Sequence, residues 1–284
     1  MDAKRFEQLL QMQLNQTRRV AGYAARREID DIRRSLADQP RRLEHFGFKV
    51  YSQNDEDGML EEIFGRLGIA GGCFVEIGVE NGLECNTLYL LHKGWRGLWI
   101  DGNPRQKHAI ESRFKSLLDN GRLQLHTGFV TAENINPLFE QLGVPQNGLD
   151  FLSIDVDGMD IYLLEAMAAR PKVVCIEYNS KFPAQLNKRP QYNPNNGWRG
   201  TDYMGSSLLA LSEAANTRGY TLVGSNVVGI NAFFVRSDLA GDLFDDAGNV
   251  QALYNPPRYW LCQDHFSAIG HTADFGPYVD LLNP

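Results

Sequence analysis

The sequence has few cysteines, no long apolar run and no excess of positive charge, and each absence argues against a class of protein. Its four cysteines lie far apart, without the Cys-x-x-Cys pair that marks zinc or a redox dithiol. No apolar run approaches the roughly 20 residues that cross a bilayer, and the N-terminus lacks the apolar core of a secretory signal. The net charge of −7 disfavours nucleic acid as a partner. We therefore expect a soluble, cytoplasmic protein without a transmembrane segment.

Residues 1–48 differ in composition from the rest of the chain and predict a helical arm. They are rich in Arg, Gln and Glu, and apolar residues such as Phe6, Leu9 and Ile29 recur at helical spacing. This narrow apolar stripe could pack on the main domain, join another subunit in a homo-oligomer, or touch an acidic lipid surface. Residues 49–284 are predicted to form the main domain.

In the main domain, short β-rich apolar runs alternate with longer segments of helical period, as in a parallel sheet flanked by helices. We predict an α/β fold with a doubly wound, mostly parallel, seven-stranded sheet that ends in a hairpin-like pair. The predicted strands are 73–77, 97–100, 123–127, 151–154, 173–177, 220–224 and 232–235. The predicted helices are 58–67, 84–93, 104–120, 161–169 and 206–218.

Residues 181–205 interrupt this alternation, because they are dense in Asn, Pro and aromatic residues. A connection of this length in a compact domain is usually a functional loop or lid. It follows the fifth predicted strand, on the edge where ligands bind in open α/β sheets. Lys181 in this insertion could orient a substrate oxygen, and His265 or His271 in the C-terminal tail, residues 250–284, could close over the site.

A turn with two glycines follows the first predicted strand. Glu76 ends that strand, Gly78 and Gly82 lie in the turn, and a helix follows, so backbone N–H groups face the crevice. Glu80 stands where a dinucleotide site needs its second glycine, and its charge would repel a pyrophosphate. Glu76 suits the positive ammonium and sulfonium groups of S-adenosylmethionine (SAM), and Asp101 at the next strand tip can accept both ribose hydroxyls. The pattern therefore favours SAM over NAD.

The predicted cofactor contacts lie in this turn, at the second strand tip and at the fourth. They are Glu76, Gly78, Glu80, Asn81, Gly82, Thr87, Asp101, Asn103 and Asp155.

Acidic side chains follow two neighbouring strands of the predicted sheet. Asp155 and Asp157 follow the fourth strand, and Glu177 and Asn179 lie at the end of the fifth. Adjacent parallel strands bring these tips together, and carboxylates with an amide suit Mg²⁺ or Mn²⁺. Such a metal helps a substrate hydroxyl to lose its proton, which a neighbouring carboxylate can accept. Alternatively, Asp157 or Glu177 acts as a base without metal, or Asp155 only bonds nearby backbone.

Three segments also carry a family resemblance. They are Tyr51-Ser52-Gln53 with the acids that follow, FVEIGVENGLECNTLYLLHKGWRGLWIDGNP at 74–104, and LSIDVDGMDIYLLEAM at 152–167. Together they resemble the FkbM-type and Star-like methyltransferase families over about residues 51–235. The resemblance implies a class I methyltransferase fold that binds SAM through Glu76, Gly78, Gly82 and Asp101.

The tip of the fourth strand is also similar to the Asp-x-Asp-x-Tyr segment of macrocin-type sugar O-methyltransferases, which depend on magnesium. This resemblance implies that Asp155 binds the metal and that Asp157 is the base. The chain departs from that family at the fifth strand, where Glu177-Tyr178-Asn179 replaces an Asp-Asp ligand pair. FkbM-type members commonly have Glu at the position of Asp157.

From these features we expect methyl transfer from SAM to a hydroxyl, most readily on a sugar of a glycan or of a glycosylated small molecule. The candidate catalytic residues are Asp157, Asp155, His265 and Lys181, and the candidate metal ligands are Asp155, Asp157, Glu177 and Asn179. One alternative is N- or carboxyl-methylation of a protein or peptide. Another is a non-catalytic scaffold that keeps the methyltransferase fold.

Overall fold

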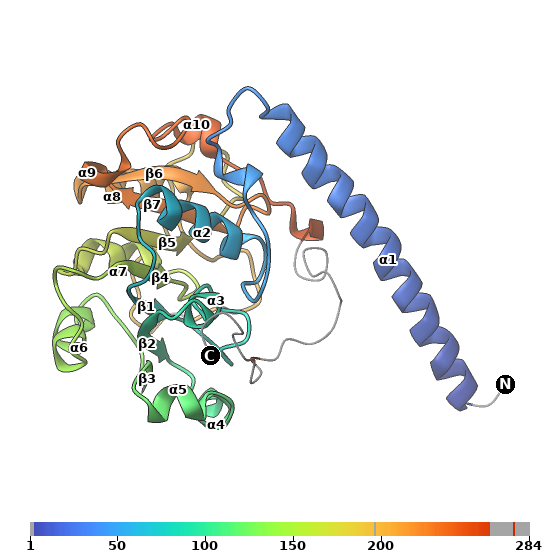
Figure 1. Ribbon diagram of the computed structural model, residues 1–284, viewed down its shortest axis with the longest axis horizontal. Helices are drawn as coiled ribbons and strands as arrows, with labels where there is room; N and C mark the ends of the chain where they lie inside the picture. The colour runs from blue at the N-terminus through green and yellow to red at the C-terminus, as the bar shows by residue number, and fades with distance from the viewer. Residues whose placement is uncertain (1–2, 196, 262–274, 276–284) are drawn as a thin grey trace.

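The structure, a computed structural model, describes residues 3–195, 197–261 and 275. A seven-stranded sheet in the order β3-β2-β1-β4-β5-β7-β6 runs through the main domain (Figure 1). The strands are β1 Cys73–Ile77, β2 Arg96–Asp101, β3 Leu123–Thr127, β4 Phe151–Ile154, β5 Val173–Glu177, β6 Tyr220–Ser225 and β7 Asn231–Arg236.

Strands β1 to β5 pair in parallel, whereas β7 runs antiparallel to both β5 and β6. The chain enters β7 directly from β6, so these two strands form the expected hairpin-like pair. This strand order, with β7 reversed, is that of the class I methyltransferase fold. The prediction of a doubly wound, mostly parallel sheet is therefore confirmed.

Helices cover both faces of this sheet, and a long helix precedes it. The α-helices are α1 Ala3–Ser35, α2 Glu56–Arg66, α3 Leu88–His92, α4 Pro104–Arg113, α5 Lys115–Asp119, α6 Ile135–Gln141, α7 Asp160–Ala166, α8 Leu208–Thr217, α9 Ser237–Ala240 and α10 Val250–Leu253. The short 3₁₀ helices are η1 Leu43–His45 and η2 Tyr259–Leu261.

The sheet separates two hydrophobic cores, because successive residues of a strand point to opposite faces. Phe74 and Phe151 contribute to the core beneath α2, α3, α4 and α5. Val75 and Leu152, their neighbours in sequence, contribute to the core beneath α6, α7, α8 and α10. Burial on both faces explains why the strands are continuous apolar runs rather than alternating patterns.

Several helices differ from the sequence prediction. The helix expected at 84–93 begins only at Leu88, because the preceding residues bond to the end of β1. The helix expected at 104–120 divides into α4 and α5 at Phe114, whose buried ring packs edge-on against Trp99 with 4.9 Å between ring centroids. Helices α6, α9 and α10 lie in segments to which the sequence assigned no element.

Helix α1 is the predicted arm, and it projects from the main domain along much of its length (Figure 1). Only its second half contacts the domain, where Ala25 and Ile29 are buried. Trp260 of η2 donates a hydrogen bond from its indole nitrogen to Glu28 of α1 (2.9 Å). Among the described residues, no helix combines the length and apolar character needed to cross a membrane.

Candidate active site

The carboxyl ends of β1, β2, β4 and β5 meet at one edge of the sheet. Strand β1 lies between β2 and β4, and β4 pairs with β5, so the four ends are neighbours. Ligands of open α/β sheets bind outside this edge, where the strand order reverses. The turns that leave these strands carry most of the predicted site residues.

The turn after β1 is built from left-handed backbone conformations. Gly78 and Gly82 have φ angles of 90° and 77°, and Glu80 between them has 47°, which is rare for a residue with a side chain. A Cβ atom at Gly78 would lie 1.7 Å from the main-chain oxygen of Asp155, and one at Gly82 would lie 2.7 Å from the Trp99 ring. Gly78 therefore brings the turn directly against the acidic tip that follows β4.

Glu76, at the end of β1, is buried and bonded to the protein. Its carboxylate accepts hydrogen bonds from the backbone N–H of Asn86 (2.8 Å) and from the N–H and hydroxyl of Thr87 (3.0 and 2.5 Å). The indole of Trp99 donates to the same hydroxyl (2.7 Å). Burial raises the pKa of Glu76 to about 7 despite these bonds. Glu76 and Thr87 hold residues 84–87 in place, and their role as cofactor contacts stays a prediction.

Asp101, at the end of β2, organises the other side of the same crevice. Its two oxygens accept the backbone N–H groups of Glu80 and Asn103, each at 2.7 Å. Each carboxylate oxygen keeps a second lone pair, so Asp101 can still accept two ribose hydroxyls. Asn103 caps α4 with its side chain, and the Asn81 side chain closes its own turn. Glu80 is exposed, and desolvation followed by the charge of Asp101 raises its pKa.

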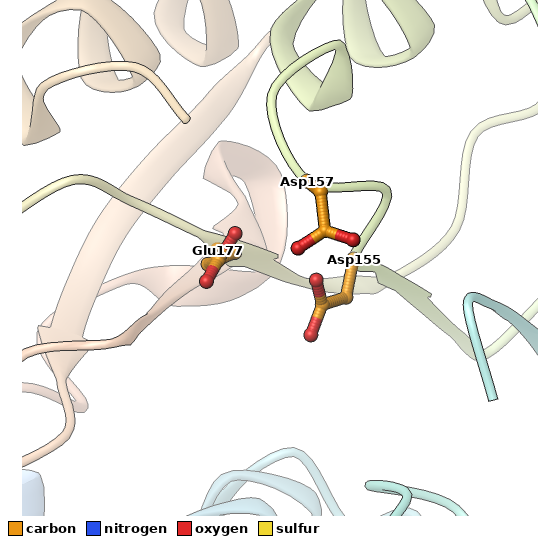
Figure 2. Close-up of side chains that lie close together, drawn as sticks. All are labelled: Asp155, Asp157 and Glu177. Atoms are coloured by element: carbon orange, nitrogen blue, oxygen red, sulfur yellow. The ribbon is translucent and has the colours of Figure 1, made fainter. Parts of the chain in front are cut away.

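Three carboxylates converge where β4 and β5 end. Figure 2 shows Asp155 and Asp157 on the loop that leaves β4, with Glu177 beside them at the end of β5. One oxygen from each of these side chains lies within 4.8 Å of the others. The sequence prediction that the two strand tips meet here agrees with this geometry.

A fourth acid, Asp160, shapes this loop and was missed by the sequence analysis. Its two oxygens accept the backbone N–H groups of Val156 and Gly158, each at 2.8 Å. These bonds fold the loop so that Asp157 adopts a φ of 56°. A strained conformation of this kind in a non-glycine residue is common at functional sites. The available signal was an acid in the first turn of a helix, placed to bond the N–H groups of the preceding loop.

Desolvation, followed by the charges of neighbouring acids, raises the pKa values at this site. For Asp155, desolvation followed by the charges of Asp160 and Asp157 raises the pKa well above its usual range. Desolvation raises the pKa of Asp157 and, together with the charge of Asp155, that of Glu177. A positive charge among these carboxylates would favour their ionised forms.

Glu177 supplies the observation that fits a metal ion. The residue is 6% exposed, and its Oε2 atom is buried without any hydrogen-bond partner. A buried carboxylate oxygen is normally bonded, so an unbonded one needs an explanation such as an ion. The oxygens of Asp155, Asp157 and Glu177 form a hard, negatively charged donor set of the kind that Mg²⁺ or Mn²⁺ prefers.

Asn179 is held by the insertion that follows β5. Its side-chain nitrogen donates to the main-chain oxygens of Asp202 (3.0 Å) and Met204 (2.5 Å), and its Oδ1 accepts from the N–H of Lys181 (3.2 Å). The residue therefore fastens the 181–205 insertion to the end of β5. Its role as a metal ligand stays a prediction.

The Lys181 ammonium, half exposed, forms an ion pair with Asp202 within the insertion, and its catalytic role stays a prediction. His265 and His271 lie outside the described residues.

A buried polar network lies behind the site, in residues 52–57, which the sequence singled out only through a family resemblance. Oε1 of Glu56 accepts a hydrogen bond from the side-chain amide of Asn231 (2.9 Å), the residue that pairs with Glu177 across β5 and β7. Burial and then the charge of Glu56 raise the pKa of Asp55 to about 7. The network therefore reaches the end of β5 through Asn231.

No protein-family model matches this chain, and no curated protein shows significant similarity to it. Solved structures are similar in fold. An O-methyltransferase from Bacillus cereus in complex with SAH is 13% identical over 74% of this chain and 89% of its own, with a TM-score of 0.40. A candidate caffeoyl-CoA O-methyltransferase from Staphylococcus aureus is 12% identical over 73% of this chain and 91% of its own, with a TM-score of 0.44. A candidate O-methyltransferase from Klebsiella pneumoniae is 14% identical over 68% of this chain and 84% of its own, with a TM-score of 0.38.

These identities are below 25% and these TM-scores are below 0.5. We therefore base the function on the residues of the site. The likeness to FkbM-type and Star-like methyltransferases stays a resemblance of motifs and is not a family assignment.

Proposed function

We propose that this protein transfers the methyl group of SAM to a hydroxyl of its acceptor. The observation that carries the proposal is the contact between two strand ends. The turn at Gly78 fits closely against the main chain of Asp155, so a donor held by the turn would present its methyl group to the carboxylates that follow β4.

The donor site is formed by backbone and by one carboxylate. The two glycines let the turn from Gly78 to Gly82 lie directly against the main chain of Asp155 and the ring of Trp99, which sets where the turn borders the crevice. Asp101 would accept the ribose hydroxyls, with Asn103 beside it at the start of α4. Glu80 and Asn81 would border the positively charged end of the donor, where the carboxylate of Glu80 is favourable. Glu76 positions residues 84–87 through its hydrogen bonds, and the second lone pair of its Oε1 would accept a bond from the ammonium group of the donor.

Asp157 is the proposed base. The acceptor hydroxyl gives its proton to the Asp157 carboxylate while its oxygen forms a bond to the methyl carbon and the bond from that carbon to sulfur breaks. A raised pKa, caused here by desolvation, strengthens a carboxylate as a base. Asp160 holds the loop in the conformation that presents Asp157.

Asp155, Asp157 and Glu177 would hold the divalent ion. When bound, Mg²⁺ or Mn²⁺ lowers the pKa of a coordinated hydroxyl and offsets the repulsion among the acids. The unbonded Oε2 of Glu177 supports this part of the proposal. Without the ion, Asp157 alone is the base, which is the competing form of the same reaction.

The acceptor is proposed to be a sugar of a glycan or of a glycosylated small molecule. A pocket of about 520 Å³ lies in the insertion, with Tyr192, Tyr203, Asn193 and Arg199 in its wall. The N–H of Asn193 contacts the sulfur of Met159 (3.3 Å), two residues after the proposed base. Aromatic faces with amide groups match the apolar faces and hydroxyls of a pyranose.

Methyl transfer from isotopically labelled SAM to a glycan fraction tests the proposal. We expect label in the carbohydrate that survives mild base, because a methyl ether is stable to base, and we expect chelation to stop transfer until Mg²⁺ or Mn²⁺ is restored. Label in protein, or label released by base as from a carboxyl methyl ester, would refute the assignment of a sugar hydroxyl. Activity that survives chelation would refute the role of the metal, and Asp157 would then act as the base without it.

A further inference from the structure

The first part of α1 leaves an extensive apolar surface in water. We call residues 4–24 the projecting segment. Its large apolar side chains are exposed by between 45% and 67%, whereas soluble monomers rarely expose apolar patches of this extent without a partner. These side chains are Phe6, Leu9, Leu10, Met12, Leu14, Val20 and Tyr23. Within the described residues, burial of α1 against the main domain begins at Ala25.

The projecting segment is amphipathic, with Arg18 and Arg19 opposite its apolar side. A residue advances by about 100° around an α-helix, so nine residues amount to two and a half turns. Arg18 and Arg19 follow Leu9 and Leu10 by nine residues and therefore lie on the opposite side of the helix. The segment thus has the form of a helix that lies in a membrane interface with its apolar side buried.

Charge separates the projecting segment from the rest of the chain. Residues 4–24 contain four basic residues and one acid, Glu7, for a net charge of +3. Residues 25–284 contain 24 basic and 33 acidic residues, for a net charge of −9. The segment is about 32 Å long and points away from the domain (Figure 1), far beyond the screening length of about 8 Å at physiological salt. Its positive charge therefore acts independently of the acidic domain.

An anionic lipid surface complements both the apolar side and the positive charge of the projecting segment. Pairing with a second copy would instead bring two segments of the same charge together. We propose that the projecting segment lies in the interface of an anionic membrane, with the Leu9–Leu10 side toward the acyl chains. Anionic headgroups attract the basic residues, and acyl chains cover the apolar ones.

Two exposed aromatic residues extend the apolar side of α1. Tyr259 and Trp260 of η2 are 50% and 60% exposed, and Trp260 bonds to Glu28 of α1. Glu28 follows Leu10 by 18 residues, which is five full turns, so it lies on the Leu10 side of the helix. Tyr and Trp are enriched where a protein meets the membrane–water interface. These two side chains would therefore meet the same lipid surface as the segment.

Sedimentation of the full-length protein with lipid vesicles tests the proposal. We expect binding to vesicles of phosphatidylglycerol and phosphatidylcholine, and at least tenfold weaker binding to phosphatidylcholine alone or in 0.5 M salt, where charges are screened over about 4 Å. The double variant Leu9→Glu/Leu10→Glu should bind at least tenfold more weakly. The matched control Gln11→Glu/Asn15→Glu adds the same charge on the polar side, so it should keep most of the binding. Unchanged thermal unfolding of both variants would show that the main domain is intact.

Two results would overturn the proposal. One is the absence of binding to anionic vesicles by the natural sequence. The other is a dimer in light scattering that Leu9→Glu/Leu10→Glu converts to a monomer, because the segment's partner would then be a second copy of the chain. Neither result bears on SAM binding, so the proposed enzymatic function is tested separately.

Discussion

Replacement of Gly78 by alanine should move the turn after β1, here called the donor turn, away from the loop after β4 that carries Asp155 and Asp157. Gly94→Ala is the matched control. Both glycines adopt left-handed backbone conformations, with φ angles of 90° and 85°. A side chain at Gly94 would meet nothing within 4 Å, whereas one at Gly78 would lie 1.7 Å from the main-chain oxygen of Asp155. The pair of variants therefore distinguishes backbone strain from close approach.

The two variants differ in the displacement that they require. Left-handed backbone costs a non-glycine residue about 1–2 kcal/mol, which lowers the melting temperature by roughly 2–8 °C for a protein of this size. Only Gly78→Ala must also move its Cβ atom from 1.7 Å to a contact of about 3.3 Å from Asp155. That shift is roughly 1.5 Å, and misplacement by about 1 Å can reduce a rate on the order of 100-fold.

Calorimetry with SAM and a labelled-methyl assay measure the result. Gly94→Ala should melt at a lower temperature but keep SAM affinity and turnover within about twofold. Gly78→Ala should bind SAM at least tenfold more weakly and lose turnover by about 100-fold. Equal SAM affinity in the two folded variants would refute the contact between the donor turn and the reaction centre.

Three further predictions concern the acids. Asp155→Ala should abolish methyl transfer while SAM affinity changes only a few-fold, and equal losses would place Asp155 in the donor site instead. Asp160→Ala removes two charge-assisted hydrogen bonds, worth about 1.5–3 kcal/mol each, so it should lower stability far more than Asp202→Ala, which removes one exposed ion pair. Because the pKa of Asp55 is raised, the folded state binds the Asp55 proton at higher pH than the unfolded state does. The free energy of unfolding should therefore fall as the pH rises from about 4 to 7, by up to about 1.4 kcal/mol per pH unit. Urea unfolding at pH 5 and 7.5 should show that the free energy of unfolding decreases less in Asp55→Asn than in the natural sequence. A larger decrease in the variant would contradict this direction.

Most of the sheet could be predicted from sequence because its strands are short apolar runs with clear ends. The errors lie where distant side chains decide local structure. The helix expected from residue 84 begins later because Glu76 takes the N–H groups of Asn86 and Thr87, and α4 ends because Phe114 turns inward against Trp99. Such contacts join residues ten or more positions apart, so periodicity within one window does not reveal them.

For the site, too, the positions of the residues could be predicted from sequence, but their hydrogen-bond partners could not. Asp155, Asp157 and Glu177 could be predicted to meet, because parallel strands place their carboxyl ends at one edge. Which of the polar residues would be free for a ligand could not be predicted, since that depends on donors elsewhere in the chain. Asn179 is taken by the main-chain oxygens of the insertion, and Asp160 was overlooked because one acid at a helix start has many possible uses.

The most direct test of the central claim is isothermal titration of the purified protein with SAM, repeated with Asp101→Ala. We predict binding of one SAM molecule per chain, competition by S-adenosylhomocysteine, and at least tenfold weaker binding in the variant. Absence of binding at millimolar SAM, or equal binding by the variant, would contradict the donor site that the whole account rests on.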